Sequence, residues 1–353
     1  LIPLLIAYAI HNSFIFDTSA NFLIFFTILG FIYFISLPKG QEIKLKPAKI
    51  NSYLFGAVAV ALTITSIIAV YKINIIQAKA NYTSTRGIIA GWANDFPGAI
   101  VKFEEAISYE APGKYEIRNR FAQYILEKTN SGKLTPEYAD AVNRAIVAVQ
   151  KNVDENKVDY LPYLYMSRLY IILGKEDPGS KYNDKALEYS LQALALAPDF
   201  VRTYYEVAQA YLNKKDFDKA VEYFRRAAEL NPEVGLSYWY WGVVEIERGN
   251  TDGGLEILEK AIGSGIYSPS VSDLSRLMSV YVAKKDLGKM VWVSELMAKA
   301  DPANAQYHAS LAVAYAQAGL IDKAIEQARE AAKLDPKFES EARSFVQSLG
   351  REW

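Results

Sequence analysis

The sequence predicts an all-α protein in which transmembrane helices come first and an α-solenoid of helical hairpins follows. Two observations carry this prediction: two long stretches near the N-terminus have no charged residue, and four prolines in the second half recur with a regular spacing. A third observation is compositional, because 51% of the 353 residues are hydrophobic, which argues against a disordered chain. Stacked hairpins of this kind are expected to form a right-handed superhelix.

The charge-free stretches have the length of membrane spans. Residues 18–38 and 50–71 contain no Asp, Glu, Lys or Arg. An α-helix of about 20 apolar residues crosses the hydrocarbon core of a bilayer and satisfies its backbone hydrogen bonds internally. We therefore expect a lipid bilayer around both stretches, with residues 1–10 as the end of a third span. A pair of buried helices in a soluble protein is the alternative.

The first residues of the sequence also indicate whether it is part of a longer protein. The chain begins at Leu1 within apolar sequence, without Met and without the basic segment that opens a signal peptide. We expect the sequence to be the C-terminal part of a longer protein.

Loop charges predict the orientation of the spans. The loop at residues 39–49 carries four lysines against the single Glu42, whereas residues 11–18 contain no Lys or Arg. The positive-inside rule places the lysine-rich loop in the cytoplasm. We therefore expect a multi-pass protein of the inner (cytoplasmic) membrane, with residues 73–353 on the extracytoplasmic, periplasmic side.

Four prolines mark an internal repeat. Pro198 and Pro232 lie 34 residues apart, as do Pro302 and Pro336, and the 70 residues between Pro232 and Pro302 leave room for two units. A 34-residue unit of two helices that ends in proline resembles the tetratricopeptide repeat (TPR). The unit at 199–232 fills the small and aromatic positions of that pattern with Tyr204, Ala208, Tyr211, Ala220, Phe224, Ala227 and Pro232.

Other units follow the pattern less closely. Glu245 and Gly254 depart from it in the unit after Pro232. The unit that ends at Pro198 fits if about seven residues, near the segment KEDPGSK, are inserted between its helices. The expected domains are membrane segments at 1–72, linking helical hairpins at 73–157, the repeat solenoid at 158–337 and a capping helix at 338–353.

The first helix of each hairpin is expected to line the concave face of the solenoid. Helical spacing then predicts an apolar and aromatic groove with arginines at one end. Such a groove suits an extended peptide, a partner helix or a sugar chain. The alternative is that Trp239 and its neighbours only pack between helices. The candidate groove residues are Arg168, Arg202, Tyr205, Gln209 and Trp239.

Composition excludes several kinds of chemistry. The sequence has no cysteine, and its two histidines, His11 and His308, are far apart, so we expect no metal site. A formal net charge of −1 without a basic segment argues against a nucleic-acid partner. Motifs for nucleotide cofactors, serine nucleophiles and zinc proteases are missing. We therefore expect no cofactor and no catalytic residue in this sequence.

The membrane end carries a further resemblance. A short run of aromatic and polar residues precedes the first complete span, namely Tyr8, Asn12, Phe14, Phe16, Asp17 and Thr18. This phrase, followed by a long apolar helix, one more span and then repeats, is similar to the C-terminal part of the bacterial O-antigen ligase and polymerase superfamily. The resemblance implies a glycan transferase that moves a saccharide from a polyprenyl-diphosphate carrier to an acceptor, without a metal.

That resemblance places the catalytic arginines and histidine upstream, where no position of this sequence matches them. Whether the longer protein is an enzyme therefore stays open. His11, Asn12 and Asp17 are expected in an outer loop, where they either shape the floor of the active site or simply end two helices. The alternative function is a membrane-tethered scaffold without chemistry of its own, for envelope or pilus assembly.

Overall fold

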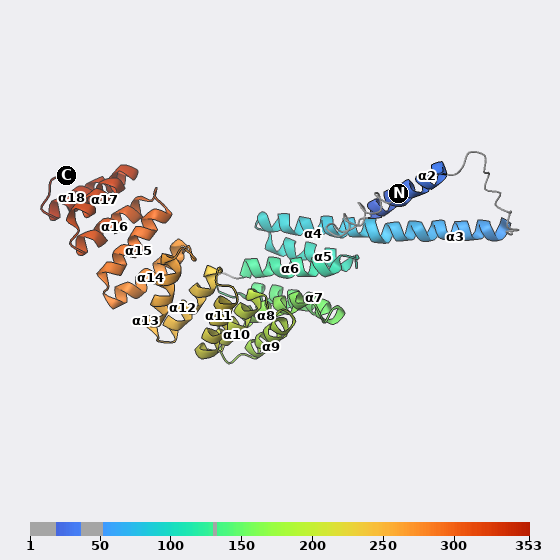
Figure 1. Ribbon diagram of the computed structural model, residues 1–353, viewed down its shortest axis with the longest axis horizontal. Helices are drawn as coiled ribbons and strands as arrows, with labels where there is room; N and C mark the ends of the chain where they lie inside the picture. The colour runs from blue at the N-terminus through green and yellow to red at the C-terminus, as the bar shows by residue number, and fades with distance from the viewer. Residues whose placement is uncertain (1–18, 37–51, 130–132) are drawn as a thin grey trace. The chain divides into compact units, whose positions relative to one another are not determined.

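The computed structural model describes residues 19–36, 52–129 and 133–353, and every regular element within these ranges is a helix (Figure 1). The all-α prediction is therefore confirmed for the described residues. The chain divides into two compact units, Leu1–Tyr71 and Lys72–Trp353.

The first unit contains two apolar helices, α2 (Ser19–Ser36) and α3 (Ser52–Val70), within the predicted spans. Most of their large apolar side chains that the structure describes are exposed, among them Phe31, Leu62 and Ile67, each more than half exposed. Residues 1–10, with His11, Asn12 and Asp17, lie outside the described residues.

A single helix in the described ranges, Gly56–Trp92, is long and apolar enough to cross a membrane, judged by length and composition alone. It comprises most of α3, a π-helical segment η1 (Tyr71–Ile75) and α4 (Ile76–Trp92). Membrane crossing itself stays a prediction.

The second unit is built from successive helix pairs. Two pairs come first, α4 with α5 (Phe96–Ser108) and α6 (Lys114–Thr129) with α7 (Pro136–Glu155). The repeat region follows with α8 (Tyr160–Gly174), α9 (Lys181–Leu196), α10 (Val201–Asn213), α11 (Phe217–Leu230), α12 (Gly235–Glu247), α13 (Thr251–Gly263), α14 (Val271–Lys284), α15 (Leu287–Ala300), α16 (Ala305–Gln317), α17 (Ile321–Leu334), the 3₁₀ turn η2 (Pro336–Phe338) and α18 (Glu339–Ser348).

Local sequence sets where these helices begin and end. Asp95, Asp216 and Asp286 each accept a hydrogen bond from the backbone N–H three residues further on, which caps α5, α11 and α15. The four repeat prolines each stand two residues after the last residue of α9, α11, α15 or α17. Because proline lacks the N–H and clashes with the preceding turn, the helix cannot continue there.

Small residues bring the two helices of a repeat together. Ala208 of α10 and Ala220 of α11 are fully buried, and Phe224 packs beside them. Further along the chain, buried side chains from α12 to α15 form one cluster. The final helix, α18, packs on α17 through Ala342 and Val346, in the segment that we predicted to cap the solenoid.

The departures from the repeat pattern have structural reasons. A Cβ atom on Gly254 would lie 2.5 Å from the carbonyl oxygen of Gly242, so the close approach of α12 and α13 needs glycine there. The carboxylate of Glu245 is buried and accepts hydrogen bonds from Trp241, Arg248 and Asn250. Although burial opposes ionisation, these hydrogen bonds lower the pKa of Glu245 overall.

The predicted insertion near KEDPGSK is the turn between α8 and α9. Asn183, which is fully buried, donates from its side-chain amide to the carbonyl oxygens of Gly174, Asp177 and Pro178. One side chain therefore supports the backbone of the whole turn.

Candidate functional site

A cleft of about 330 Å³ lies along α8, α10 and α12, the first helices of three successive repeat pairs. Leu126 of α6 and Phe224 of α11 complete its lining. Its charged residues are Arg168 of α8, Lys175 directly after α8, and Arg202 and Glu206 of α10.

Glu206 stands between the two arginines. Its Oε1 atom lies 3.5 Å from Nε of Arg168 and 3.4 Å from Nε of Arg202. The Glu206 side chain is 10% exposed, whereas that of Arg202 is 45% exposed. Burial raises the pKa of the Glu206 carboxyl, against the opposing attraction of Arg168 and Arg202. Burial likewise lowers the pKa of the Arg168 guanidinium.

Aromatic rings form one wall of the cleft. Tyr205 of α10 meets Tyr240 of α12 edge to face, with 5.4 Å between the ring centroids. The hydroxyl of Tyr205 shares a hydrogen bond of 2.6 Å with Ser237, which holds the ring in place. Leu236, one turn before Tyr240, adds an aliphatic side chain that is 37% exposed.

Amide side chains join the cleft to the turn between α8 and α9. Gln209 donates to Oδ1 of Asn213 at 3.2 Å. Asn213 in turn donates to the carbonyl oxygen of Ile171 at 2.9 Å and to Oδ1 of Asn183 at 3.2 Å. Asn213 therefore belongs both to the cleft wall and to the network that supports the turn.

Four of the five residues that the sequence suggested line this one cleft: Arg168, Arg202, Tyr205 and Gln209. Trp239 lies outside it. The Trp239 ring is 5% exposed and stacks on Tyr267 with 5.2 Å between centroids, inside the apolar cluster of α12 to α15.

Sequence reasoning missed Glu206 and Tyr240 as lining residues. A signal for Glu206 was present, because it lies four residues after Arg202 and so on the same face of α10.

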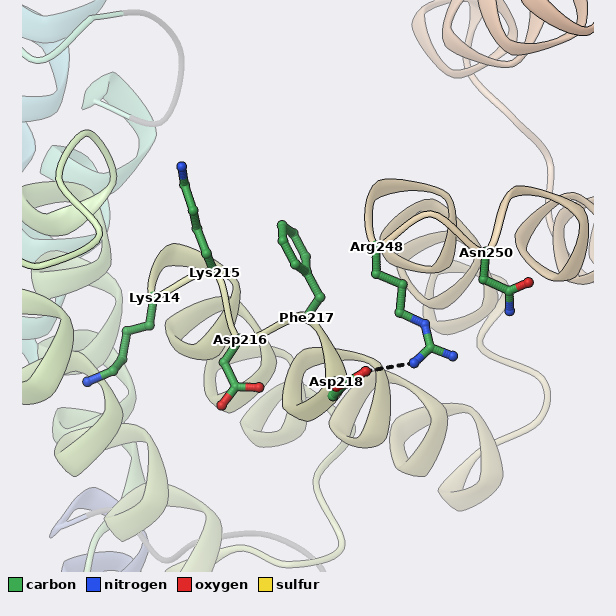
Figure 2. Close-up of a pocket in the computed structure, with 7 residues that line it drawn as sticks. All are labelled: Lys214, Lys215, Asp216, Phe217, Asp218, Arg248 and Asn250. Carbon is green, nitrogen blue, oxygen red and sulfur yellow. Dashed lines mark hydrogen bonds and ion pairs between the residues drawn. The ribbon is translucent and has the colours of Figure 1, made fainter.

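A second depression lies at the turns beside α11 and α12 (Figure 2). Arg248 forms an ion pair of 2.8 Å with Asp218 there, and Lys214 is paired with Asp184. Figure 2 shows Lys215 extending away from the other labelled side chains. Lys214 and Arg248 each have a carboxylate of their own here, whereas Arg168 and Arg202 share one in the cleft, so this depression is a poorer anion site than the cleft. Within the described ranges, no group of three or more His, Asp or Glu residues could hold a metal ion.

Comparison with known families identifies the repeats. Residues 201–234 and 297–337 both match the tetratricopeptide repeat family. The prediction of tetratricopeptide repeats is therefore confirmed for these two segments. No curated protein sequence matches the chain.

The solved structures to which the chain is similar include the following three. YrrB, described as a TPR protein with an unusual peptide-binding site, is 21% identical, with 54% of this chain and 93% of that chain covered and a TM-score of 0.37. A tetratricopeptide repeat protein from Parabacteroides merdae is 12% identical, with 76% and 97% covered and a TM-score of 0.46. Yeast Tom70 is 17% identical, with 83% and 58% covered and a TM-score of 0.47.

Proposed function

We propose that the repeats bind an extended segment of a partner protein in the cleft along α8, α10 and α12. The observation that carries this proposal is the cleft itself, which combines an aromatic wall with the exposed Arg202 and the half-buried Arg168. Aromatic and arginine side chains in a concave pocket are the anchors that dominate binding energy at protein interfaces. Because these side chains stand on packed helices, little ordering is needed on binding.

A matched pair of leucines tests this proposal. Leu236 lines the cleft and Leu230, at the end of α11, does not, yet both are 37% exposed. Leu236→Asp is expected to abolish retention of randomised octapeptides by the immobilised chain, measured by affinity selection and mass spectrometry. Leu230→Asp is expected to retain them. Equal retention by both variants would exclude the cleft as the binding site.

We also propose that the protein is anchored in the cell membrane, with the repeats on the extracytoplasmic side. The length and apolar composition of Gly56–Trp92 support the anchor. The four lysines at 39–49 support the orientation, because basic loops stay in the cytoplasm.

The absence of cysteine in the sequence makes the orientation easy to test. Val158 lies in the repeat-bearing unit and is 80% exposed, so Val158→Cys should react with a membrane-impermeant maleimide in cells whose outer barrier is opened. Lys44→Cys should react only after the inner membrane is broken. The reverse pattern would overturn the orientation.

A finer proposal concerns the longer protein. We propose that this chain is the C-terminal part of an O-antigen ligase-like or polymerase-like glycan transferase, in which the repeats present an acceptor or recruit a partner. The run from Tyr8 to Thr18, followed by an apolar segment and repeats, supports it. A lipid-linked glycan and its acceptor would then be additional partners. The scaffold for envelope or pilus assembly is the alternative, and it rests on the same repeats.

The parent gene separates these two proposals. Glycan transfer requires further apolar spans encoded upstream, with an outer loop that bears Arg and His. An open reading frame that starts just before Leu1 would exclude the transferase.

A further inference from the structure

We propose that the cleft selects a segment in which an acidic residue is flanked by apolar residues, and that Glu206 competes with that acidic residue for the two arginines. This inference rests on the proposed peptide-binding function and adds the chemistry of the peptide.

The first step is the incomplete pairing of the arginines. A guanidinium has five N–H donors, and both Arg168 and Arg202 contact Glu206 through Nε. Within the described part of the chain, neither guanidinium has another hydrogen-bond or ion-pair partner. The contacts of 3.4 and 3.5 Å are also longer than the roughly 2.8 Å of a strong charge-assisted hydrogen bond. Both arginines can therefore receive a second carboxylate.

The second step is the balance of charge. Two guanidinium groups, those of Arg168 and Arg202, share the single carboxylate of Glu206, so this cluster carries a net positive charge. The chain as a whole has a net charge of −1, so this excess of positive charge is local to the cleft. An anionic ligand is favoured there, and a cationic one is repelled.

The third step is the order of the helices. The arginines stand on α8 and α10, in the middle of the cleft. The half-buried Ile171 of α8 and the buried Leu126 of α6 line the α8 side, and Leu236 and Tyr240 line the α12 side. Apolar contacts on both sides suit an acidic residue within a segment. A peptide that binds through its C-terminal carboxylate would have residues on only one side of that carboxylate. It would therefore reach the apolar contacts on one side of the arginines and leave those on the other side unused.

The fourth step is the role of Glu206. Its single carboxylate holds both arginines in place before a ligand arrives, and it repels the carboxylate that comes to them. A ligand that brings its own carboxylate must therefore share the arginines with Glu206. Removing the charge of Glu206 should strengthen binding of an acidic segment and leave a neutral one unaffected.

Matched peptide pools test the selection without any mutation. The probes are acetylated and amidated heptapeptides with Glu, Gln or Lys at the centre, Leu, Phe, Tyr or Val on both sides, and Ser or Ala outside. The full 353-residue chain in lipid nanodiscs is used. We expect the best Glu peptide to bind about tenfold or more tightly than its Gln counterpart by fluorescence anisotropy, since a hydrogen bond to a charged group is of that order.

Two variants and one control assign the effect to the arginine pair. Arg202→Gln should bring the ratio of Glu-peptide to Gln-peptide affinity close to one. Glu206→Gln should raise the affinity of the Glu peptide several-fold and leave the Gln peptide unchanged. Arg225→Gln is the control, because Arg225 of α11 is also half-exposed and pairs with a glutamate four residues on, outside the cleft.

The outcomes separate this inference from the proposed function. Equal binding of Glu and Gln peptides, lost in Leu236→Asp, would leave a peptide site and overturn its acid selection. No binding of any pool would overturn both. A Gln peptide with a free C-terminus that binds as tightly as the amidated Glu peptide would overturn the choice of an internal acid. Weaker binding of the Glu peptide by Glu206→Gln, with an unchanged melting temperature, would overturn the competition.

Discussion

Glu206 is a carboxylate in a place where little water reaches it. Burial raises the pKa of its carboxyl, while Arg168 on α8 and Arg202 on its own helix oppose that shift, and the ring of Tyr240 faces it from α12. A raised pKa in the folded state means that the folded chain binds this proton more readily than the unfolded chain does. The stability that protonation contributes is present below the ordinary value of 4.5 and is lost as pH rises through the raised pKa.

Binding of an acidic peptide should follow the same titration. As pH falls toward the raised pKa of Glu206, its carboxylate is neutralised and stops competing for Arg168 and Arg202. The glutamate of the peptide is exposed before binding and keeps an unshifted pKa, so it stays ionised when Glu206 takes up its proton. We expect the Kd of the Glu peptide, measured by anisotropy, to decrease as pH falls through the raised pKa of Glu206. Glu206→Gln should remove this dependence, and parallel profiles in the two proteins would contradict it.

Single residues also show the limit of periodicity. Trp239 and Tyr240 are neighbours on α12, rotated by about 100° around the helix axis. Helical spacing pointed to Trp239 as a groove residue. In the structure Trp239 stacks on Tyr267, and its neighbour Tyr240 lines the cleft instead. The partner ring at Tyr267 lies in an irregular segment after α13, and the repeat pattern contains no information about its position.

At the scale of helices, the contact between α12 and α13 depends on glycine. Gly254→Ala would place a Cβ against the carbonyl oxygen of Gly242, a backbone atom that cannot rotate away. We expect a loss of about 1–3 kcal/mol in the free energy of unfolding, measured by urea denaturation, because overpacking forces the helices apart.

Gly263 provides the control for this substitution. It lies in the same helix, and a Cβ there would meet nothing within 4 Å. Gly263→Ala should be neutral or stabilising by up to about 1 kcal/mol, because alanine favours the helix more than glycine does. A similar loss in both variants would mean that the close contact does not limit packing.

The helices themselves were largely predictable, because their signals are local. Prolines and capping aspartates lie within a few residues of the ends that they define, so sequence alone places those ends. The turn between α8 and α9 was predictable as an insertion but not as a structure. Its support comes from Asn183 and, through it, from Asn213, which lies 30 residues away along the chain.

At the scale of the whole molecule, the two units differ in how much of their apolar side-chain surface is exposed. The second unit buries several apolar clusters of its own. Apolar side chains of α2 and α3 remain exposed in the first unit, where burial in lipid would stabilise them by about 0.8 kcal/mol per CH₂ group.

We therefore expect the complete chain to float with liposomes in a density gradient and a fragment of residues 72–353 to stay in the aqueous fraction. Circular dichroism of the fragment should show that it is still helical. A complete chain that remains in the aqueous fraction would contradict the membrane anchor.

The sequence predicted the all-α class and the repeats because both follow from residues that recur at regular spacings. It could not place the charged centre of the cleft, because that centre depends on which of several arginines and glutamates face one another across α8 and α10. Spacing along one helix does not determine such pairs between helices.

The shared amide network has a consequence for how such a protein diversifies. Asn213 ties the cleft to the turn after α8, and Lys175 at the start of that turn is itself part of the lining. Insertions or deletions in this turn would reposition a binding contact while the small and aromatic positions that hold the repeats together stay untouched. Changes in the length of this one turn could therefore alter which ligand is preferred among descendants of the protein, while the helices still fold.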